Sequence, residues 1–444
     1  MKKLLLLSLF LAAFTSNAQI EWTEQSTNYP VSGSYTGDVA IVDENIAWSM
    51  VQRVTATNHQ RFSKTSDGGI TWTTGAINVG NTTGLGIGNI TAADSDTAWV
   101  SVFPVSTALG TQGIYKTTNG GTTWTKQTTA AFTSASFCNF VYFWDANNGV
   151  CMGDKRGGYF EIYTTTNGGT NWTRTPSANI ASTSTDYSYT GKYFVTGNTV
   201  WFGTDNGELM RSTDRGLNWT AITTPVPDFG GGTDTTSVAE FAFSDNNHGF
   251  ILKETYDASA NFLSTTLYRT DDGGANWDEV SVTSGSIFHG SIAFAGPGVL
   301  LTAGSSTDNF GSAYSLDNGA SWTAIDEDSH TTLNIKDATT GYSGGFASGG
   351  TGGIFKLSNT LGTPSFATSK FKVFPNPATS NVTISTVDID SYKLSVTDLT
   401  GKVVMTKSLS GIENHLDISA LSTGAYFFEL SSNNKKEVVK VLKN

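Results

Sequence analysis

The sequence predicts an all-β protein in which a seven-bladed β-propeller with N-terminal strand closure is followed by a small β-sandwich. Three observations predict this fold class. A motif of eight residues that ends in Trp recurs six times, three other strand patterns recur seven times, and the composition changes near residue 370. The six Trp residues lie 52, 48, 47, 58 and 45 residues apart, and a repeat of this length indicates a propeller, a solenoid or an array.

The recurring motif has the chemistry of a hairpin that caps itself. Each copy has Ser or Thr first, Asp or Asn third, Gly fifth and Trp eighth, as in residues 117–124. Asp and Asn side chains bond backbone N–H groups in turns, Gly takes a positive φ without steric cost, and Trp at the start of a strand buries a large apolar face. We therefore predict structural roles for Asp67, Trp72, Asn119, Trp124, Asn167, Trp172, Asp214, Trp219, Asp272, Trp277, Asp317 and Trp322.

These copies resemble the Asp-box, or BNR, repeat of sialidases, sortilin-type receptors, xyloglucanases and photosystem II assembly factors. The resemblance implies that each box lies on the hairpin between the outer two strands of a blade, away from the face that meets ligands. It also implies that the box carboxylates are structural and neither catalytic nor metal-binding.

A count of the strand patterns indicates how the ring closes. The first three patterns of each unit occur seven times, whereas the Trp strand follows a box only six times. Residues 353–359 open like a seventh unit but reach no Trp, and the missing piece stands at residues 20–25 (IEWTEQ). We infer that Trp22 supplies the last strand of the blade built by residues 329–359, which protects the strand edges of a propeller spanning residues 19–360.

The N-terminus has the pattern of a secretory signal peptide. A charged start (MKK) precedes a mostly apolar run at residues 4–14, and small residues follow. We place cleavage between Ala18 and Gln19, so that residues 1–18 form the signal peptide. The apolar run is too short for a membrane-spanning helix, and no other run is long and apolar enough.

The C-terminal part differs from the repeats. Residues 361–370 are predicted to be a linker, and residues 371–444 alternate in about seven short strands without a box or a Trp, which favours a small β-sandwich. Its landmarks are a Lys-rich end and Pro375, Asn376, Pro377, Gly401, Gly424 and Tyr426. The alternative interpretation is a generic carbohydrate-binding or fibronectin-like module.

This tail resembles the type A C-terminal sorting domain of the type IX (Por) secretion system. The resemblance implies Sec export to the periplasm and then translocation across the outer membrane by the type IX machinery, which would be a partner of the tail. The protein is then either secreted or anchored to the outer-membrane surface, with the tail usually removed.

The net charge excludes nucleic acid as a partner, and the expected strand register keeps the two cysteines apart. The net charge of −12 and the pI of about 4.8 make nucleic acid an unsuitable ligand, because a phosphate backbone needs a basic face. If the hairpin turns near Asn147, Cys151 faces roughly residue 143 and Cys138 lies about five residues out of register, too far for a disulfide. We expect two free, buried thiols.

No catalytic signature is present, and the five His residues lack metal-ligand spacing, so we expect no metal or cofactor. A sialidase would need an arginine triad, and none of the seven Arg residues falls on a predicted inner strand. The long loops on the face opposite the boxes offer candidate binding residues, namely Phe103, Tyr187, Asp228, Phe229, Tyr256, Asp257 and Phe262. These aromatic rings and carboxylates either bind sugars or pack the loops down.

The sequence thus favours a secreted or surface-displayed, monomeric propeller that binds an extracellular glycan or protein. The alternative is an extracellular glycoside hydrolase, whose two carboxylates no spacing identifies. A third possibility is a structural component of the envelope.

Overall fold

A computed structural model describes residues 20–105, 111–132, 136–182, 187–232, 234–296, 298–306, 309–359, 371–386, 391–398, 402–432 and 435–444. The expected cleavage site at Ala18 and Gln19, the expected linker at 361–370, and Gly401 lie outside these residues. The chain divides into two compact units, Met1–Leu361 and Gly362–Asn444.

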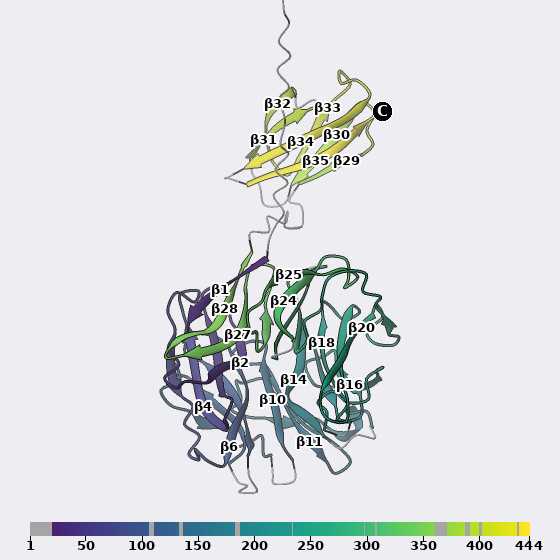
Figure 1. The fold of residues 1–444 in the computed structure, drawn as a ribbon. Coiled ribbons are helices and arrows are strands. Elements are labelled where there is room, and N and C mark those ends of the chain that lie inside the picture. Colours follow the sequence, from purple (N-terminus) through teal and green to yellow (C-terminus); the bar gives the residue numbers. More distant parts are fainter. Residues whose placement is uncertain are drawn as a thin grey trace, which may run out of the picture. The chain divides into compact units, whose positions relative to one another are not determined.

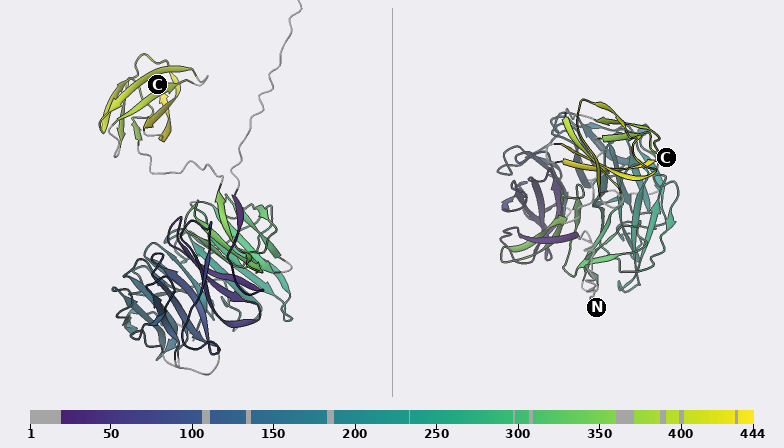
Figure 2. Two further views of the ribbon diagram at one scale, coloured as in Figure 1. Left: turned by 90° about the vertical axis from the view of Figure 1, so that its left-hand side faces the viewer. Right: turned by 90° about the horizontal axis from the view of Figure 1, so that it is seen from above.

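The first unit is a seven-bladed β-propeller, as predicted (Figures 1 and 2). Blades 1 to 3 consist of β2 (Ser34–Ile41), β3 (Ala47–Arg53), β4 (Ala56–Thr65) and β5 (Thr73–Ala76); β6 (Leu85–Ala92), β7 (Ala98–Pro104), β8 (Gly113–Thr117) and β9 (Thr125–Lys126); and β10 (Cys138–Phe143), β11 (Gly149–Arg156), β12 (Tyr159–Thr165) and β13 (Thr173–Arg174). Blades 4 and 5 consist of β14 (Ser188–Thr196), β15 (Thr199–Thr204), β16 (Glu208–Ser212) and β17 (Thr220–Thr223), and of β18 (Ser237–Phe243), β19 (Gly249–Tyr256), β20 (Phe262–Thr270) and β21 (Asp278–Glu279). Blade 6 consists of β22 (Ser291–Phe294), β23 (Leu300–Ser306), β24 (Asn309–Ser315) and β25 (Thr323–Asp326), and blade 7 of β26 (Leu333–Ile335), β27 (Gly341–Ser348), β28 (Thr351–Asn359) and β1 (Ile20–Ser26). One short 3-10 helix, η1 (Ser177–Asn179), follows blade 3.

Clusters of buried apolar side chains join neighbouring blades, and we call each such contact a seam. At the seam between blades 1 and 2, Trp48 and Phe62 pack with Ile90, Val100 and Trp124. Among the described residues, eight clusters of this kind cover the seven seams of the ring, with two at the seam of blades 7 and 1. Because burial of apolar area is the dominant favourable term in folding, the seams hold the blades together.

The boxes build the seams through their tryptophans. The Trp124 ring lies with its centroid 6.4 Å from that of Trp48 and 6.0 Å from that of Phe62, both on the preceding blade. Trp72 likewise lies 5.6 Å from Tyr342 of blade 7. The expectation that each Trp begins the fourth strand is off by one residue, since β5 and β9 begin just after it and the indole turns into the seam instead.

The box turn is held by its own side chains. In the first copy, the Thr65 hydroxyl donates to Asp67 Oδ1 at 2.8 Å and accepts the N–H of Gly69 at 2.8 Å. Asp67 accepts the backbone N–H of Thr71 at 2.9 Å and its hydroxyl at 2.6 Å. The other five copies repeat the Ser/Thr bonds and the bond from the seventh residue's N–H to the third side chain.

The ring closes as the sequence predicts. Strand β1 pairs antiparallel with β28, and Trp22 stands opposite Leu357. The Trp22 indole Nε1 donates to Ser312 Oγ of blade 6 at 3.0 Å, so Trp22 occupies the position that a box Trp occupies at other seams. Strands β2 and β27 also pair, with Tyr35 opposite Phe346, and this joins blades 1 and 7 into one eight-stranded sheet.

The two cysteines are free and buried, as expected, but the expected strand register is wrong. Cys151 stands opposite Val141, not near residue 143, and Cys138 stands opposite Gly153. The physical reason is that Asp145 accepts the N–H groups of the next turn residues and centres the turn one residue earlier, while a bulge after Cys138 shifts the rest of the strand. Burial raises the pKa of both thiols.

The second unit is a β-sandwich of two sheets, as predicted. One sheet has the order β29 (Phe371–Phe374), β30 (Asn381–Thr386), β33 (Glu413–Asp417), and the other β32 (Val403–Ser410), β31 (Ser391–Thr397), β34 (Gly424–Ser432), β35 (Lys435–Lys443). Their inner faces share one apolar core. Asn376 fixes the last strand, since its Nδ2 donates to the Lys440 carbonyl at 2.7 Å and its Oδ1 accepts the Leu442 N–H at 2.9 Å. Tyr426 donates to the Ser422 carbonyl at 2.9 Å.

Replacing Trp22 by Ala should destabilise the propeller by about 2–4 kcal/mol, because it removes apolar packing and the bond to Ser312. The loss should fall below that of a fully buried Trp, since Trp22 is only partly buried. Urea unfolding measures it, with the exposed neighbour change Glu21→Ala as control. Equal stability of both variants and the wild type would contradict closure through Trp22.

Candidate functional site

The antiparallel blades give the propeller two unlike faces. The turns between first and second strands lie on the same face as the boxes, and we call this the box face. The connections between second and third strands and the links between blades lie on the other face, which we call the open face. The candidate binding residues of the sequence analysis all belong to the open face.

The structure distributes these candidates over three seams and does not bring them into one site. Phe103, near the seam of blades 2 and 3, stacks on Phe137 with ring centroids 5.3 Å apart. Tyr187, at the seam of blades 4 and 5, meets Tyr189 edge-on at 5.7 Å.

Asp228 and Phe229 lie inside the protein and not at its surface. Both are 0% exposed. Asp228 accepts the N–H groups of Gly230 and Asp234 at 2.9 Å and the hydroxyl of Tyr189 at 2.6 Å, so it organises the loop between blades 4 and 5. Phe229 packs in the apolar cluster of that seam.

The remaining candidates surround a buried histidine between blades 5 and 6. The Phe262 ring stacks on His289 with centroids 4.2 Å apart, and His289 Nδ1 lies 2.9 Å from Glu254 Oε2. Tyr256 donates to the same Glu254 carboxylate. Asp257 shapes the adjoining turn, because it accepts the N–H groups of Ser259 and Asn261.

The centre of the ring holds a polar channel. The first strand of every blade lines a cavity of about 910 Å³. Hydroxyl and amide side chains on its wall include Thr91, Thr190, Ser291, Thr332 and Asn334. Lys192 and Glu240 face the same cavity and form an ion pair, and burial raises the pKa of Glu240 although Lys192 lowers it.

Asp38 is a second carboxyl group in this channel. It accepts the N–H of Val39 at 2.9 Å, the N–H of Ile90 at 3.1 Å and the Asn334 amide at 3.2 Å, and so ties blades 1, 2 and 7 together. Burial raises the pKa of Asp38 to about 6, against the lowering effect of these donors. Asp38 and Glu240 are therefore the two carboxyl groups of the channel with raised pKa values.

A second hollow lies on the box face, where the sequence analysis expected no function. This cavity of about 540 Å³, which we call the box-face pocket, extends from blade 4 past the seam of blades 5 and 6. Its apolar lining includes Phe194, Phe243, Phe250, Phe294 and Ile335. Its polar lining includes Asp245, His248, Arg269, Asp271, Asn318, Lys336 and Asp337.

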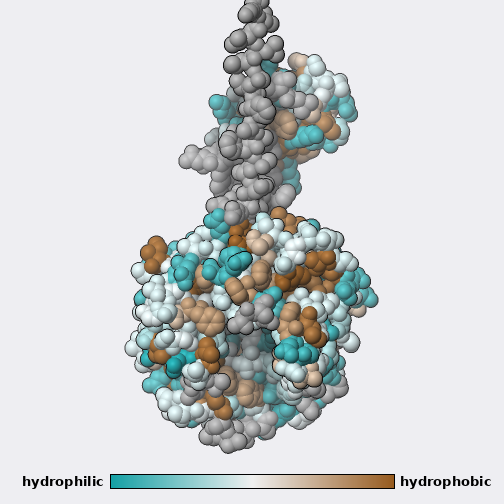
Figure 3. All heavy atoms as spheres, viewed as in Figure 1, coloured by the Kyte–Doolittle hydropathy of each residue, from teal (hydrophilic) through white to brown (hydrophobic). Residues whose placement is uncertain are grey.

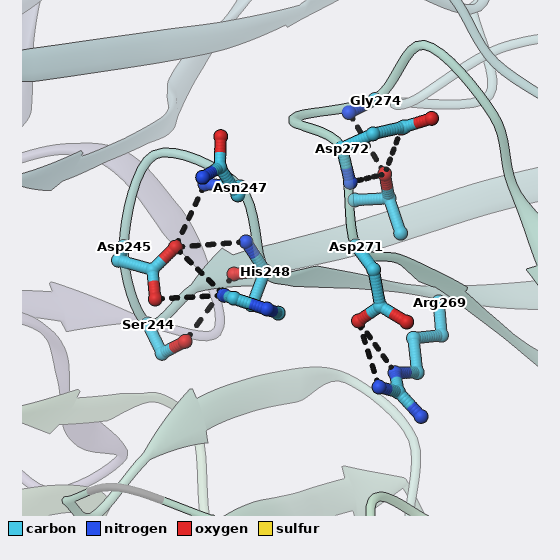
Figure 4. A network of polar contacts seen from close by, with 9 residues as sticks. Ser244, Asp245, Asn247, His248, Arg269, Asp271, Asp272 and Gly274 are labelled. Carbon is cyan, nitrogen blue, oxygen red and sulfur yellow. Dashed lines mark hydrogen bonds and ion pairs between the residues drawn. The ribbon is translucent and has the colours of Figure 1, made fainter.

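Figure 4 shows the polar groups of this pocket in two sets. His248 Nδ1 lies 2.8 Å from Asp245 Oδ2, on the turn between β18 and β19. Arg269 Nε donates to Asp271 Oδ1 at 2.9 Å, beside the box of blade 5. These residues were not predicted from the sequence, because the resemblance to the Asp-box implies that ligands meet the opposite face. The one available signal was Asn318, which stands where four boxes have Gly.

The part of the chain that the structure describes contains no group of three His, Cys, Asp or Glu residues placed to hold a metal ion. No helix in the same residues has the length and apolar character needed to cross a membrane.

Sequence comparison assigns the tail. Residues 372–444 match the family described as the secretion system C-terminal sorting domain. The chain therefore carries a tail that directs export through the type IX secretion system to the cell surface or the extracellular space, and that interacts with the secretion machinery. No curated protein matches the sequence.

Solved structures resemble the propeller in fold alone. YCF48 bound to a D1 peptide is 12% identical, with a TM-score of 0.52, over 78% of this chain and 96% of that one. YCF48 from Cyanidioschyzon merolae is 16% identical, with a TM-score of 0.49, over 76% and 98%. A GH74 xyloglucanase from Xanthomonas campestris is 14% identical, with a TM-score of 0.49, over 83% of this chain and 60% of that one. The chain is thus an exported protein built on a β-propeller.

Replacing Asp154 by Asn should reduce the pH dependence of stability between about pH 4 and pH 6. Burial raises the pKa of Asp154 from 3.8 to about 6, so the folded state binds a proton that the unfolded state releases. Its contribution to stability is full below pH 4 and is lost as the pH rises through 6.

Asn at position 154 can keep both accepted bonds, because Asn139 Nδ2 and the Ser188 N–H both donate to Oδ1. We expect the variant to be more stable than the wild type at pH 7.5, by on the order of 1–2 kcal/mol, after a discount for partial exposure. Urea unfolding at pH 4.5 and 7.5 tests this, and parallel pH profiles of the two proteins would contradict it.

Proposed function

We propose that this protein is an extracellular binding protein that takes a glycan into the polar channel of its propeller. One observation carries the proposal: the channel of about 910 Å³ is walled by hydroxyl and amide groups from several blades, with the Lys192–Glu240 pair among them. Sugar hydroxyls both donate and accept hydrogen bonds, and a few convergent polar groups in a concavity are typical of ligand sites.

The outer surface also bears on the kind of ligand, although less directly than the channel does. On the face visible in Figure 3, hydrophobic residues of the propeller lie in separate groups among hydrophilic ones. Large protein interfaces usually need a continuous apolar patch, so this face favours a ligand held in a hollow over a broad protein partner. We propose that the protein acts as a monomer.

A glycoside hydrolase is the second candidate function. The raised pKa values of Asp38 and Glu240 favour it, since one carboxyl group of such an enzyme must stay protonated to act as an acid. Against it, each of the two carboxylates is already held by the protein's own donors.

Glycan binding should depend on Glu240. We expect the secreted protein to bind a subset of sugars on a glycan array, and Glu240→Gln to weaken that binding at least tenfold (about 1.4 kcal/mol). The matched control is Glu279→Gln on an exposed outer strand, which should bind like the wild type. Binding that is equal in both variants would place the ligand elsewhere.

A hydrolysis screen on the same sugars separates the two functions. Release of new reducing ends that disappears in Asp38→Asn would establish the hydrolase, whereas binding without turnover supports the binding protein.

Deletion of residues 371–444 should leave the propeller in the periplasm of a host that has the type IX system, because the sorting tail is then absent. Fractionation with the full-length protein as control measures this. Surface display of the truncated protein would contradict the assignment of the tail.

A further inference from the structure

At four seams, a basic side chain on the box face links one blade to the next. Three of these side chains stand one residue before a box, and the fourth holds the equivalent place in blade 7, which has no box. All four donate to backbone carbonyl groups of the following blade. Lys356 Nζ reaches the Gly68 carbonyl at 2.6 Å, and Lys116 Nζ reaches the Gly168 carbonyl at 2.9 Å. We call these side chains clamps; the four are Lys64, Lys116, Arg211 and Lys356.

Each clamp packs against a Gly at the fourth position of the box in the following blade. A Cβ atom there would lie 2.5–3.2 Å from the clamp nitrogen, so any larger residue would push the clamp aside. The matched pairs are Lys64 with Gly120, Lys116 with Gly168, Arg211 with Gly273, and Lys356 with Gly68. At the seam of blades 3 and 4 both partners are missing, because Thr164 and Arg215 take the two places.

The seam of blades 5 and 6 breaks this rule. Arg269 stands at the clamp position, but Asn318 replaces the Gly of the next box. Among the described residues Arg269 donates only to Asp271, which precedes the Asp of its own box, and not to the neighbouring blade. Where the four clamped seams have a basic side chain and a carbonyl group in contact, this seam has the box-face pocket, lined by Arg269 and Asn318. Figure 4 shows Arg269 turned toward Asp271.

We propose that the box-face pocket binds an extended peptide segment with an apolar side chain. The peptide's backbone carbonyl takes the acceptor position beside Arg269 that a carbonyl of the next blade fills at the clamped seams. Its side chain packs on Phe194, Phe294 and Ile335, the partly exposed apolar residues of the lining, whereas Phe243 and Phe250 belong to the seam cores beneath them.

The charge balance of the pocket favours a neutral acceptor over an acid. Asp271 lies 2.7 Å from Arg269 and already neutralises the guanidinium, so a carboxylate ligand would meet a like charge. The pocket adjoins the central channel and shares lining residues such as Phe194, Phe294 and Ile335 with it, but Arg269, Asp271 and Asn318 line the pocket alone. The proposal is independent of the glycan function proposed for the channel.

The test uses the full chain and three small probes. N-acetyl-L-phenylalaninamide has the proposed features, methyl α-D-glucopyranoside represents a sugar, and acetate represents an acid. The chain has seven arginines, so the ¹H–¹⁵N signals of the arginine Nε groups can be assigned by substitution. We expect the phenylalanine amide to shift the Arg269 signal in a saturable way, and the other two probes to leave it unchanged.

Three variants separate binding from stability. Arg269→Gln should weaken binding of the phenylalanine amide at least tenfold with an unchanged melting temperature, because the hydrogen bonds and ion pair of this side chain among the described residues stay within its own blade. The matched control Lys116→Gln removes a working clamp, and should lower the melting temperature while the affinity stays within twofold. Asn318→Gly should allow Arg269 to donate to blade 6 as the clamps do at other seams. The melting temperature should then rise, and binding of the phenylalanine amide should be lost.

The proposal fails if the phenylalanine amide leaves the Arg269 signal unmoved. It also fails if the sugar or acetate binds there more tightly, or if Arg269→Gln and Asn318→Gly both bind the probe like the wild type.

Discussion

The packing of one tryptophan against the preceding blade is the interaction on which the rest of the propeller depends. The backbone of a four-stranded blade is hydrogen-bonded within the blade, but the blade cannot bury the apolar side chains on its own two faces. Its stability therefore depends on packing against the neighbouring blades. The box solves this locally. Its Ser or Thr and its Asp or Asn fix a tight turn, and the turn delivers an indole into the seam, as Trp124 is delivered between Trp48 and Phe62. Six seams repeat a variant of this contact, and Trp22 supplies the seventh.

The seam of blades 7 and 1 shows how the ring compensates for a divided core. Its buried apolar residues form two separate clusters, one of five residues and one of three, the latter being Tyr29, Val51 and Ala347. Two sets of hydrogen bonds add to the stability of this seam: the backbone pairing of β2 with β27, and the bond from the Lys356 side chain to the Gly68 carbonyl. Buried hydroxyl bonds around Tyr29 strengthen the same region, since its OH lies 2.6 Å from Thr36 Oγ1 and 3.0 Å from Ser49 Oγ. The joint that brings the two ends of the propeller together is thus held by backbone and polar bonds as well as by apolar contact.

Much of this fold could be predicted because its determinants are local and repeated. A box specifies its own turn, and counting boxes against strands was enough to infer closure through Trp22. Features set by a single residue were harder. Asp145 moved one turn by one residue and so changed the register of Cys151, and Asp228 faces inward because four donors surround it. The surroundings of Asp228 have no periodic signal, whereas the Asp145 turn repeats at Asp43, Asp94, Asp245 and Asp337, so its register could have been inferred from the repeat. The box-face pocket was not predicted for a related reason. The box is structural in all six copies, so the one residue that signals the pocket, Asn318 in place of Gly, was not interpreted.

The acidic character of the propeller follows from the same turn chemistry and says little about its ligand. Aspartates such as Asp43 and Asp94 each accept two backbone N–H groups at the turn after a first strand. The box residue Asp67 accepts one backbone N–H and two hydroxyl groups. Such donors lower the pKa of exposed carboxyl groups such as Asp67 and Asp317, which therefore stay ionised to lower pH. Five aspartates at first-strand turns and four in the boxes thus hold turns. The groups that remain for recognition are the few that face a hollow, Lys192 and Glu240 in the channel and Arg269 on the box face, and each stands where the repeat pattern is broken or where the blades converge.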